Sequence, residues 1–202
     1  DIYSWRNINI SNAYLSSYNY KREYDSHMIK NTEWGAVSYL QHSRYGNQNE
    51  MKMNTTLYKT YITGYQEENY WKQSSTSAST TGNYSGLYDM SGGAIEFVMG
   101  VMVDASGGLS NLTKNGLLSA DIAPQYYDLY KYHTSTNHFN RRILGDGTGE
   151  FGPILSTLVP NGVSYSMSWY RASAYYIYSN ASWFERGNGY IYGFSCQLDQ
   201  VL

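Results

Sequence analysis

Few side chains in this sequence have the types and spacing that catalysis or metal binding requires. Cys196 is the only cysteine, so neither an intrachain disulfide nor a cysteine metal cluster can form. No G-x-S-x-G nucleophile motif occurs. Zinc-type spacing is absent among the four histidines, which we expect at the surface or in hydrogen bonds: His27, His42, His133 and His138. The sequence therefore predicts a protein that is not an enzyme and that uses no metal and no cofactor.

Two segments contain acidic residues that could form a catalytic or calcium site. Asp89 and Glu96 lie in a glycine-rich apolar segment, but paired acid/base chemistry would need a second feature that the sequence does not offer. We expect both carboxylates to hydrogen-bond backbone. The segment Gly145–Glu150 (GDGTGE) could supply oxygen ligands to calcium, yet it lacks the regular alternation of carboxylates in a calcium loop. We interpret it as a flexible turn.

Charge and composition narrow the function classes. The 14 basic residues nearly balance the 16 acidic ones, and no basic stripe is present, so nucleic-acid binding is not expected. No apolar run is long enough to span a membrane, and Asp1 does not open a signal peptide. The unusual feature is 24 tyrosines. Tyrosine serves both adaptable binding surfaces and β-strands, so both uses are expected here.

The elements that must position these residues are short. The best helical pattern lies within 24–45, where Asn31 or Thr32 can cap the helix and Gly46 ends it. Residues 1–17 predict a short strand running into a helix, and residues 104–124 predict a loop. From 145 to 202, aromatic, small and polar residues alternate as in short strands joined by long loops. Together these patterns predict a single α+β domain over residues 1–202.

One segment carries a family resemblance. Residues 81–100 read TGNYSGLYDMSGGAIEFVMG, and they are similar to the signature N-x-x-G-L-Y-D-M-x-G-N-V-x-E-W of the formylglycine-generating-enzyme and sulfatase-modifying-factor group. The matching residues are Asn83, Gly86, Leu87, Tyr88, Asp89, Met90, Gly92 and Glu96. Two further segments, at 31–40 and 183–190, also resemble the family. The resemblance implies a C-type-lectin-like fold with two helices, a small antiparallel core sheet and long irregular loops, with 46–81 as an insertion.

The enzyme branch of that family holds copper with a pair of cysteines, which this chain cannot supply. The phrases NTEWGAVSYLQHSRYG, GLYDMSGGAIEFVMG and SWFERGNGY more closely resemble the bacterial and phage variable proteins of diversity-generating retroelements. That branch implies a secreted or cell-surface receptor or adhesin, exported by a segment outside this sequence, that binds a protein or glycan. Two alternatives remain: a pilin-like structural subunit of a surface fibre, and a formylglycine-generating-type oxidase relative that has lost its cysteine pair.

The resemblance also indicates where the ligand would bind. Residues 161–196 contain seven Tyr and seven Ser. In the resembling branch, adenine-directed mutation turns Asn codons into Tyr, Ser, Asp, His or Gly codons, so Trp183 and Glu185 would belong to the scaffold. The candidate ligand-binding positions are Tyr175, Tyr178, Asn180, Asn188, Tyr190 and Tyr192.

Family members typically close on a Gly-Phe-Arg strand well after the Arg-Gly region, whereas here Gly193-Phe194-Ser195 follows almost at once. The variable segment is therefore either shortened or placed earlier, between Val163 and Asn180. The competing interpretation of the aromatic residues is a strand pair that packs into the core.

Overall fold

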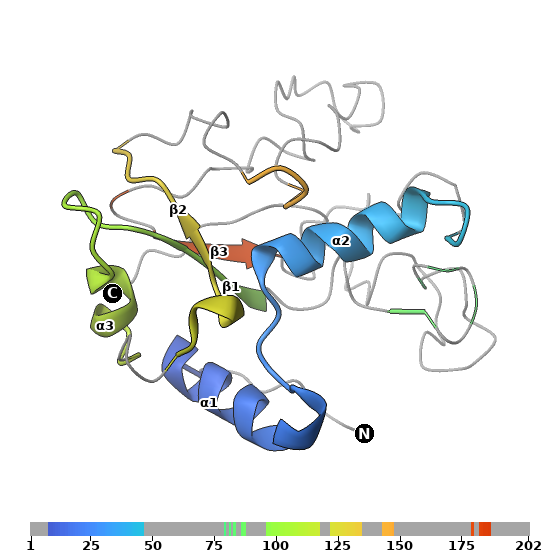
Figure 1. Ribbon diagram of the computed structural model, residues 1–202, viewed down its shortest axis with the longest axis horizontal. Coiled ribbons are helices and arrows are strands. Elements are labelled where there is room, and N and C mark those ends of the chain that lie inside the picture. The colour runs from blue at the N-terminus through green and yellow to red at the C-terminus, as the bar shows by residue number, and fades with distance from the viewer. Residues whose placement is uncertain are drawn as a thin grey trace, which may run out of the picture.

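The computed structural model describes residues 8–46, 79, 81, 83, 86, 87, 96–117, 122–134, 143–147, 179 and 182–186. This part of the chain is a mixed α+β structure, as the sequence predicts (Figure 1). Its helices and strands are, in chain order, α1 Ile10–Tyr20, the 3-10 helix η1 Arg22–Tyr24, α2 Asn31–His42, β1 Glu96–Met102, α3 Ser110–Lys114, the 3-10 helix η4 Pro124–Tyr126, β2 Asp128–Tyr130 and β3 Trp183–Arg186.

The three strands form one sheet in the order β2-β1-β3. Strand β1 pairs with β3 antiparallel, but it pairs with β2 in parallel, with Gly100 opposite Asp128. The expectation of a purely antiparallel core sheet is therefore wrong for the strands described. The reason lies in the connection: the chain leaves β1 through α3 and η4 before it enters β2, and such a crossover lets the next strand run in the same direction.

Strand β1 bulges where it meets β3. Phe97 is opposite Glu185 and Val101 is opposite Trp183, so Val98–Gly100 together face Phe184. Within the bulge, the Met99 amide donates to the Ile29 carbonyl, 2.8 Å away, rather than to a strand. The bulge therefore ties the segment before α2 to the centre of the sheet.

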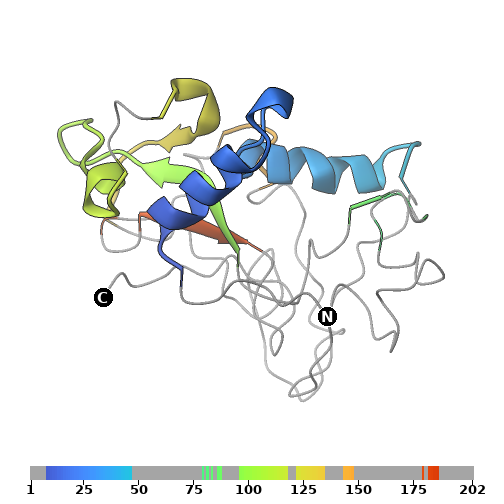
Figure 2. The same cartoon turned by 90° about the horizontal axis from the view of Figure 1, so that it is seen from below.

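The main hydrophobic core lies between the sheet, α1 and α3. It joins apolar side chains from α1, β1, α3, β3 and the flanking loops: Ile10, Tyr14, Met28, Met99, Val101, Leu112, Leu117, Ile122 and Trp183. Figure 2 shows α1 crossing the sheet, while α2 extends away from it. The opposite face of β1, at Gly100, meets Asn31, Tyr130 and Phe184 instead.

Helix α1 confirms the helix predicted near the N-terminus and continues to Tyr20. The Asn9 side chain caps it by accepting from the Asn12 amide at 2.8 Å. The strand predicted to precede it falls mainly in residues 1–7, outside the part that the structure describes.

Helix α2 confirms the strongest helical prediction, but its N-cap is Lys30 rather than Asn31 or Thr32. The Asn31 side chain is unavailable for capping because it points into the protein and bonds to Tyr130. Carboxylates take its place: Glu33 accepts from the Lys30 amide at 2.9 Å, and Asp128 of β2 accepts from the Thr32 amide at 2.7 Å.

The loop predicted over 104–124 contains the short helix α3. Leu112 is fully buried in the core, and the Asn111 side chain donates to the Met102 carbonyl at 2.6 Å. These two contacts fix a helical turn in a segment whose glycines and serines predict a loop. In the part of the chain that the structure describes, no helix has the length and apolar character needed to cross a membrane.

Candidate functional site

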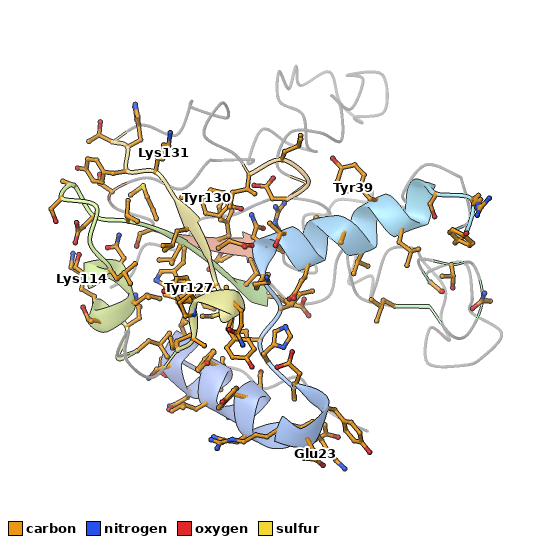
Figure 3. The ribbon with its side chains drawn as sticks, viewed as in Figure 1. Glu23, Tyr39, Lys114, Tyr127, Tyr130 and Lys131 are labelled. Atoms are coloured by element: carbon orange, nitrogen blue, oxygen red, sulfur yellow. The ribbon has the colours of Figure 1, made fainter. Side chains whose placement is uncertain are left out.

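Four polar side chains from four separate segments meet beside Gly100 and are buried together. We call Asn31, Tyr130, Asp146 and Arg186 the polar network. They come from the start of α2, the end of β2, the turn at 143–147 and the end of β3, and none is more than 2% exposed. Figure 3 labels Tyr130, which lies where these elements converge. The network thus joins segments that are distant in sequence.

Each member of the network bonds to at least one other. The Asn31 side-chain amide donates to the Tyr130 hydroxyl at 2.6 Å, and that hydroxyl donates to the Asp146 carboxylate at 2.8 Å. Arg186 closes the ring by donating from Nε to Asn31 Oδ1 and from a terminal nitrogen to the Asp146 carbonyl, both at 2.7 Å. The Ile143 amide adds a further bond to the Asp146 carboxylate at 3.1 Å.

Two glycines make this approach of segments possible. A Cβ at Gly100 would lie 2.9 Å from both Asn31 Cβ and a Phe184 ring carbon. At Gly35, a Cβ would lie 2.2 Å from the Gly145 carbonyl oxygen, so α2 and the 143–147 turn touch through backbone. A side chain at either position would force the elements apart.

The Arg186 guanidinium is only 2% exposed, and an isolated cation there would be costly. Its charge is stabilised by the two hydrogen bonds above and by the Trp34 ring, whose centroid lies 4.4 Å from the guanidinium carbon. The carboxylate of Asp146, bonded into the same network, supplies the opposite charge nearby. Breaking this arrangement on one side would leave a buried charge without compensation.

Tyr130 is held as a neutral phenol. Burial raises its pKa far above the ordinary range, and the negative charge of Asp146 raises it further, despite the opposing hydrogen bond from Asn31. The hydroxyl is therefore a donor and an acceptor at neutral pH and cannot serve as a base. Its ring also packs edge-on against Phe184, with centroids 4.7 Å apart.

The polar network holds segments of the chain together. Its hydrogen-bonding atoms bind one another, and its members are shielded from solvent. Across the residues that the structure describes, no group of three His, Cys, Asp or Glu side chains could hold a metal ion. We assign the network a positioning role because its hydrogen bonds join four separate segments of the chain.

What the network positions most directly is strand β3. At one end of β3 the Ser182 carbonyl accepts from the Met102 amide at 2.8 Å, and at the other end Arg186 enters the network. Before the strand, the Ser179 amide donates to the His133 carbonyl at 2.9 Å. Trp183 adds a hydrogen bond from its indole nitrogen to the Asn111 carbonyl at 3.4 Å. The chain is thus fixed at Ser179 and from Ser182 to Arg186.

None of the six predicted ligand-binding residues falls in the part of the chain that the structure describes. They nevertheless flank the fixed points in sequence, with some directly beside Ser179 and others after Arg186: Tyr175, Tyr178, Asn180, Asn188, Tyr190 and Tyr192. The two predicted scaffold residues in β3, Trp183 and Glu185, are buried at 2% and 5% exposure.

The other residues singled out in the sequence have mixed outcomes. Asp89 lies outside the described residues, and Glu96 begins β1 opposite Arg186. Residues 143–147 form a turn, as predicted, and the rest of the 145–150 segment lies outside the described residues. The sequence did not predict that the Asp146 side chain in this turn is fully buried and accepts the Tyr130 and Ile143 hydrogen bonds. His27 makes hydrogen bonds, as expected.

Sequence reasoning missed the polar network as a unit. Its members are spread from Asn31 to Arg186, and nothing in their local spacing links them. The available signal was the arginine that ends the run WFER, because a charge at the end of a buried strand requires a partner.

Comparison with known proteins adds no relative. No protein-family model matches the chain, and no curated protein or solved structure gives a significant match.

Proposed function

We propose that the chain is a ligand-binding variable protein, secreted or displayed at the cell surface, that presents a diversified Tyr/Ser/Asn-rich face on a C-type-lectin-like scaffold. Its ligand is a protein or a glycan. Tyrosines supply rigid contact area at low entropic cost, and Asn and Ser residues supply adaptable hydrogen bonds. The residues that make contact are Tyr175, Tyr178, Asn180, Asn188, Tyr190 and Tyr192.

The observation that supports this proposal is the anchoring of β3. Candidate positions precede and follow, in the sequence, a strand whose two ends are fixed by Ser182 and Arg186. If the residues of a binding face vary, the scaffold beneath them must stay rigid. Contact residues on a mobile scaffold would have to be ordered on binding, and the entropy cost of that ordering lowers the affinity. The buried network supplies such neighbours without using any candidate residue.

The resemblance of the 81–100 segment to the variable-protein branch supports the same proposal from the sequence. Of its matching positions, Asn83, Gly86 and Leu87 precede a segment that leads into β1, the central strand of the sheet. A family signature that leads into the central strand is consistent with a constant scaffold beneath a variable binding face.

The test uses two triple variants and a panel of purified glycans and surface-protein ectodomains. One variant replaces Tyr178, Tyr190 and Tyr192 by Ala. The control replaces three exposed tyrosines elsewhere, Tyr20, Tyr24 and Tyr45, which are 77%, 78% and 66% exposed. For any probe bound by the native protein, we expect the first variant to bind about tenfold more weakly or worse and the control to bind as the native protein does. Equal binding by the first variant, or loss in the control alone, would overturn the proposal.

A further inference from the structure

A second cluster of ionisable groups lies away from the polar network, where the chain passes from α1 to α2. It consists of Asp25, His27, Lys30, Glu33 and Tyr126. His27 sits at its centre with a side chain that is 21% exposed. The cluster joins the loop after η1, the start of α2 and the 3-10 helix η4.

Both ring nitrogens of His27 face hydrogen-bond acceptors. Nδ1 lies 2.5 Å from the Asp25 carbonyl oxygen, and Nε2 lies 3.2 Å from each carboxylate oxygen of Glu33. A neutral imidazole carries one N–H only, so one of its nitrogens would then point a lone pair at an oxygen. Only the imidazolium, with two N–H groups, can donate to both partners.

The remaining charged and titratable neighbours favour the same state. The Asp25 carboxylate lies 4.0 Å from Nδ1, and it accepts a hydrogen bond from the Tyr126 hydroxyl at 2.6 Å. The Tyr126 ring packs against the imidazole, with centroids 5.2 Å apart. One cation is near, since Lys30 Nζ lies 4.0 Å from Glu33. The carboxylates of Asp25 and Glu33 thus outnumber it around the ring.

We propose that His27 is a proton-dependent clasp that holds the start of α2 against the loop after η1 and against η4. When protonated, it links the Asp25 carbonyl to Glu33, which itself caps α2 through the Lys30 amide. When it loses its proton, one of these two links becomes a contact between lone pairs. The connection between α1 and α2 then loses one of its two hydrogen bonds at His27, while the neighbouring Met28 remains buried in the core.

The direction of the pH effect follows from the charged state. Partial burial opposes protonation of His27, but the hydrogen bonds to Asp25 and Glu33 and the charges of both acids outweigh it and raise its pKa above 6.5. A raised pKa stabilises the folded state fully below the unfolded value of 6.5. That stabilisation is lost as pH rises through the folded pKa. The clasp is therefore closed in mildly acidic solution and opens towards alkaline pH.

Histidine ring resonances followed by NMR between pH 5 and 9 on the intact chain test the clasp, with His27 assigned through His27→Gln. We expect the His27 pKa to exceed 6.5 and to fall in Glu33→Gln, because one carboxylate partner is lost. The matched control is Glu23→Gln, since Glu23 (labelled in Figure 3) is exposed and pairs with Lys21 rather than with His27. It should leave the pKa of His27 unchanged.

Thermal melting supplies a second readout that needs no assignment. Between pH 6 and pH 8 the Tm of the native chain should fall more than that of His27→Gln, because the protonated histidine stabilises the fold only below its folded pKa. A His27 pKa at or below 6.5 in the native chain would overturn the proposal, and so would an equal fall in Tm for both proteins. The NMR titration is made on the native chain and needs only His27→Gln for the assignment, so the proposal stays falsifiable even if Glu33→Gln does not fold.

Discussion

Removing the Tyr130 hydroxyl oxygen tests whether the polar network stabilises the fold. The Tyr130→Phe substitution keeps the buried ring and its edge-on contact with Phe184. It removes the donor to Asp146 at 2.8 Å and the acceptor for Asn31 at 2.6 Å. No cavity large enough for water is expected from the loss of a single oxygen, so the two partners stay buried and lose a bond each.

The magnitude follows from these two bonds. A hydrogen bond to a charged acceptor contributes about 1.5–3 kcal/mol, and a neutral one contributes about 1 kcal/mol. Tyr130→Phe should therefore lower the free energy of unfolding by about 2–4 kcal/mol. With a slope of about 2 kcal/mol per molar urea, the midpoint should fall by about 1–2 M.

Urea unfolding followed by tryptophan fluorescence measures this change. Tyr24→Phe is the matched control, because the same atom is removed from a side chain that is 78% exposed. It should change the free energy of unfolding by less than about 0.5 kcal/mol. If Tyr130→Phe were as harmless as this control, the hydroxyl would not link Asp146 to Asn31 and the reasoning on the network would be refuted.

Three further substitutions probe other parts of the fold. Arg186→Lys should destabilise by about 2–4 kcal/mol in urea unfolding, because an ammonium group cannot reproduce both hydrogen bonds of the guanidinium and its position over the Trp34 ring; native-like stability would contradict these contacts. Gly35→Ala should lower Tm by several degrees, at a cost of about 1–3 kcal/mol, because its Cβ would meet the Gly145 carbonyl; an unchanged Tm would show that the two backbones do not touch. Asn9→Ala should cost about 1 kcal/mol by removing the cap of α1, and circular dichroism melting that matches the native protein would argue against that cap.

The sequence predicted the α+β class and two of the helices because these depend on local pattern. Trp34, Val37 and Leu40 recur at helical spacing within Asn31–His42, and the helix was found there. Its cap was predicted wrongly because capping depends on where Asn31 points. That direction is set by Tyr130 and Arg186, which lie far along the chain.

The mixed sheet and the network were beyond local reasoning for the same reason. The parallel pairing of β1 with β2 follows from the path of the chain through α3, which has too few residues to show a clear helical period. Asp146 lies among glycines that are typical of an exposed turn, and only the packing of Tyr130 and Arg186 makes it a buried acceptor. Local patterns thus predict elements, whereas buried polar contacts are decided by the assembled fold.

Sequencing the gene across a population of its source organism tests the proposed function most directly. Substitutions should gather at adenine-containing codons of Tyr175, Tyr178, Asn180, Asn188, Tyr190 and Tyr192, while Trp183–Arg186 and the other members of the polar network stay constant. An invariant 161–196 segment would contradict a diversified binding face. Substitutions spread evenly over the buried residues of β3 would contradict it as well.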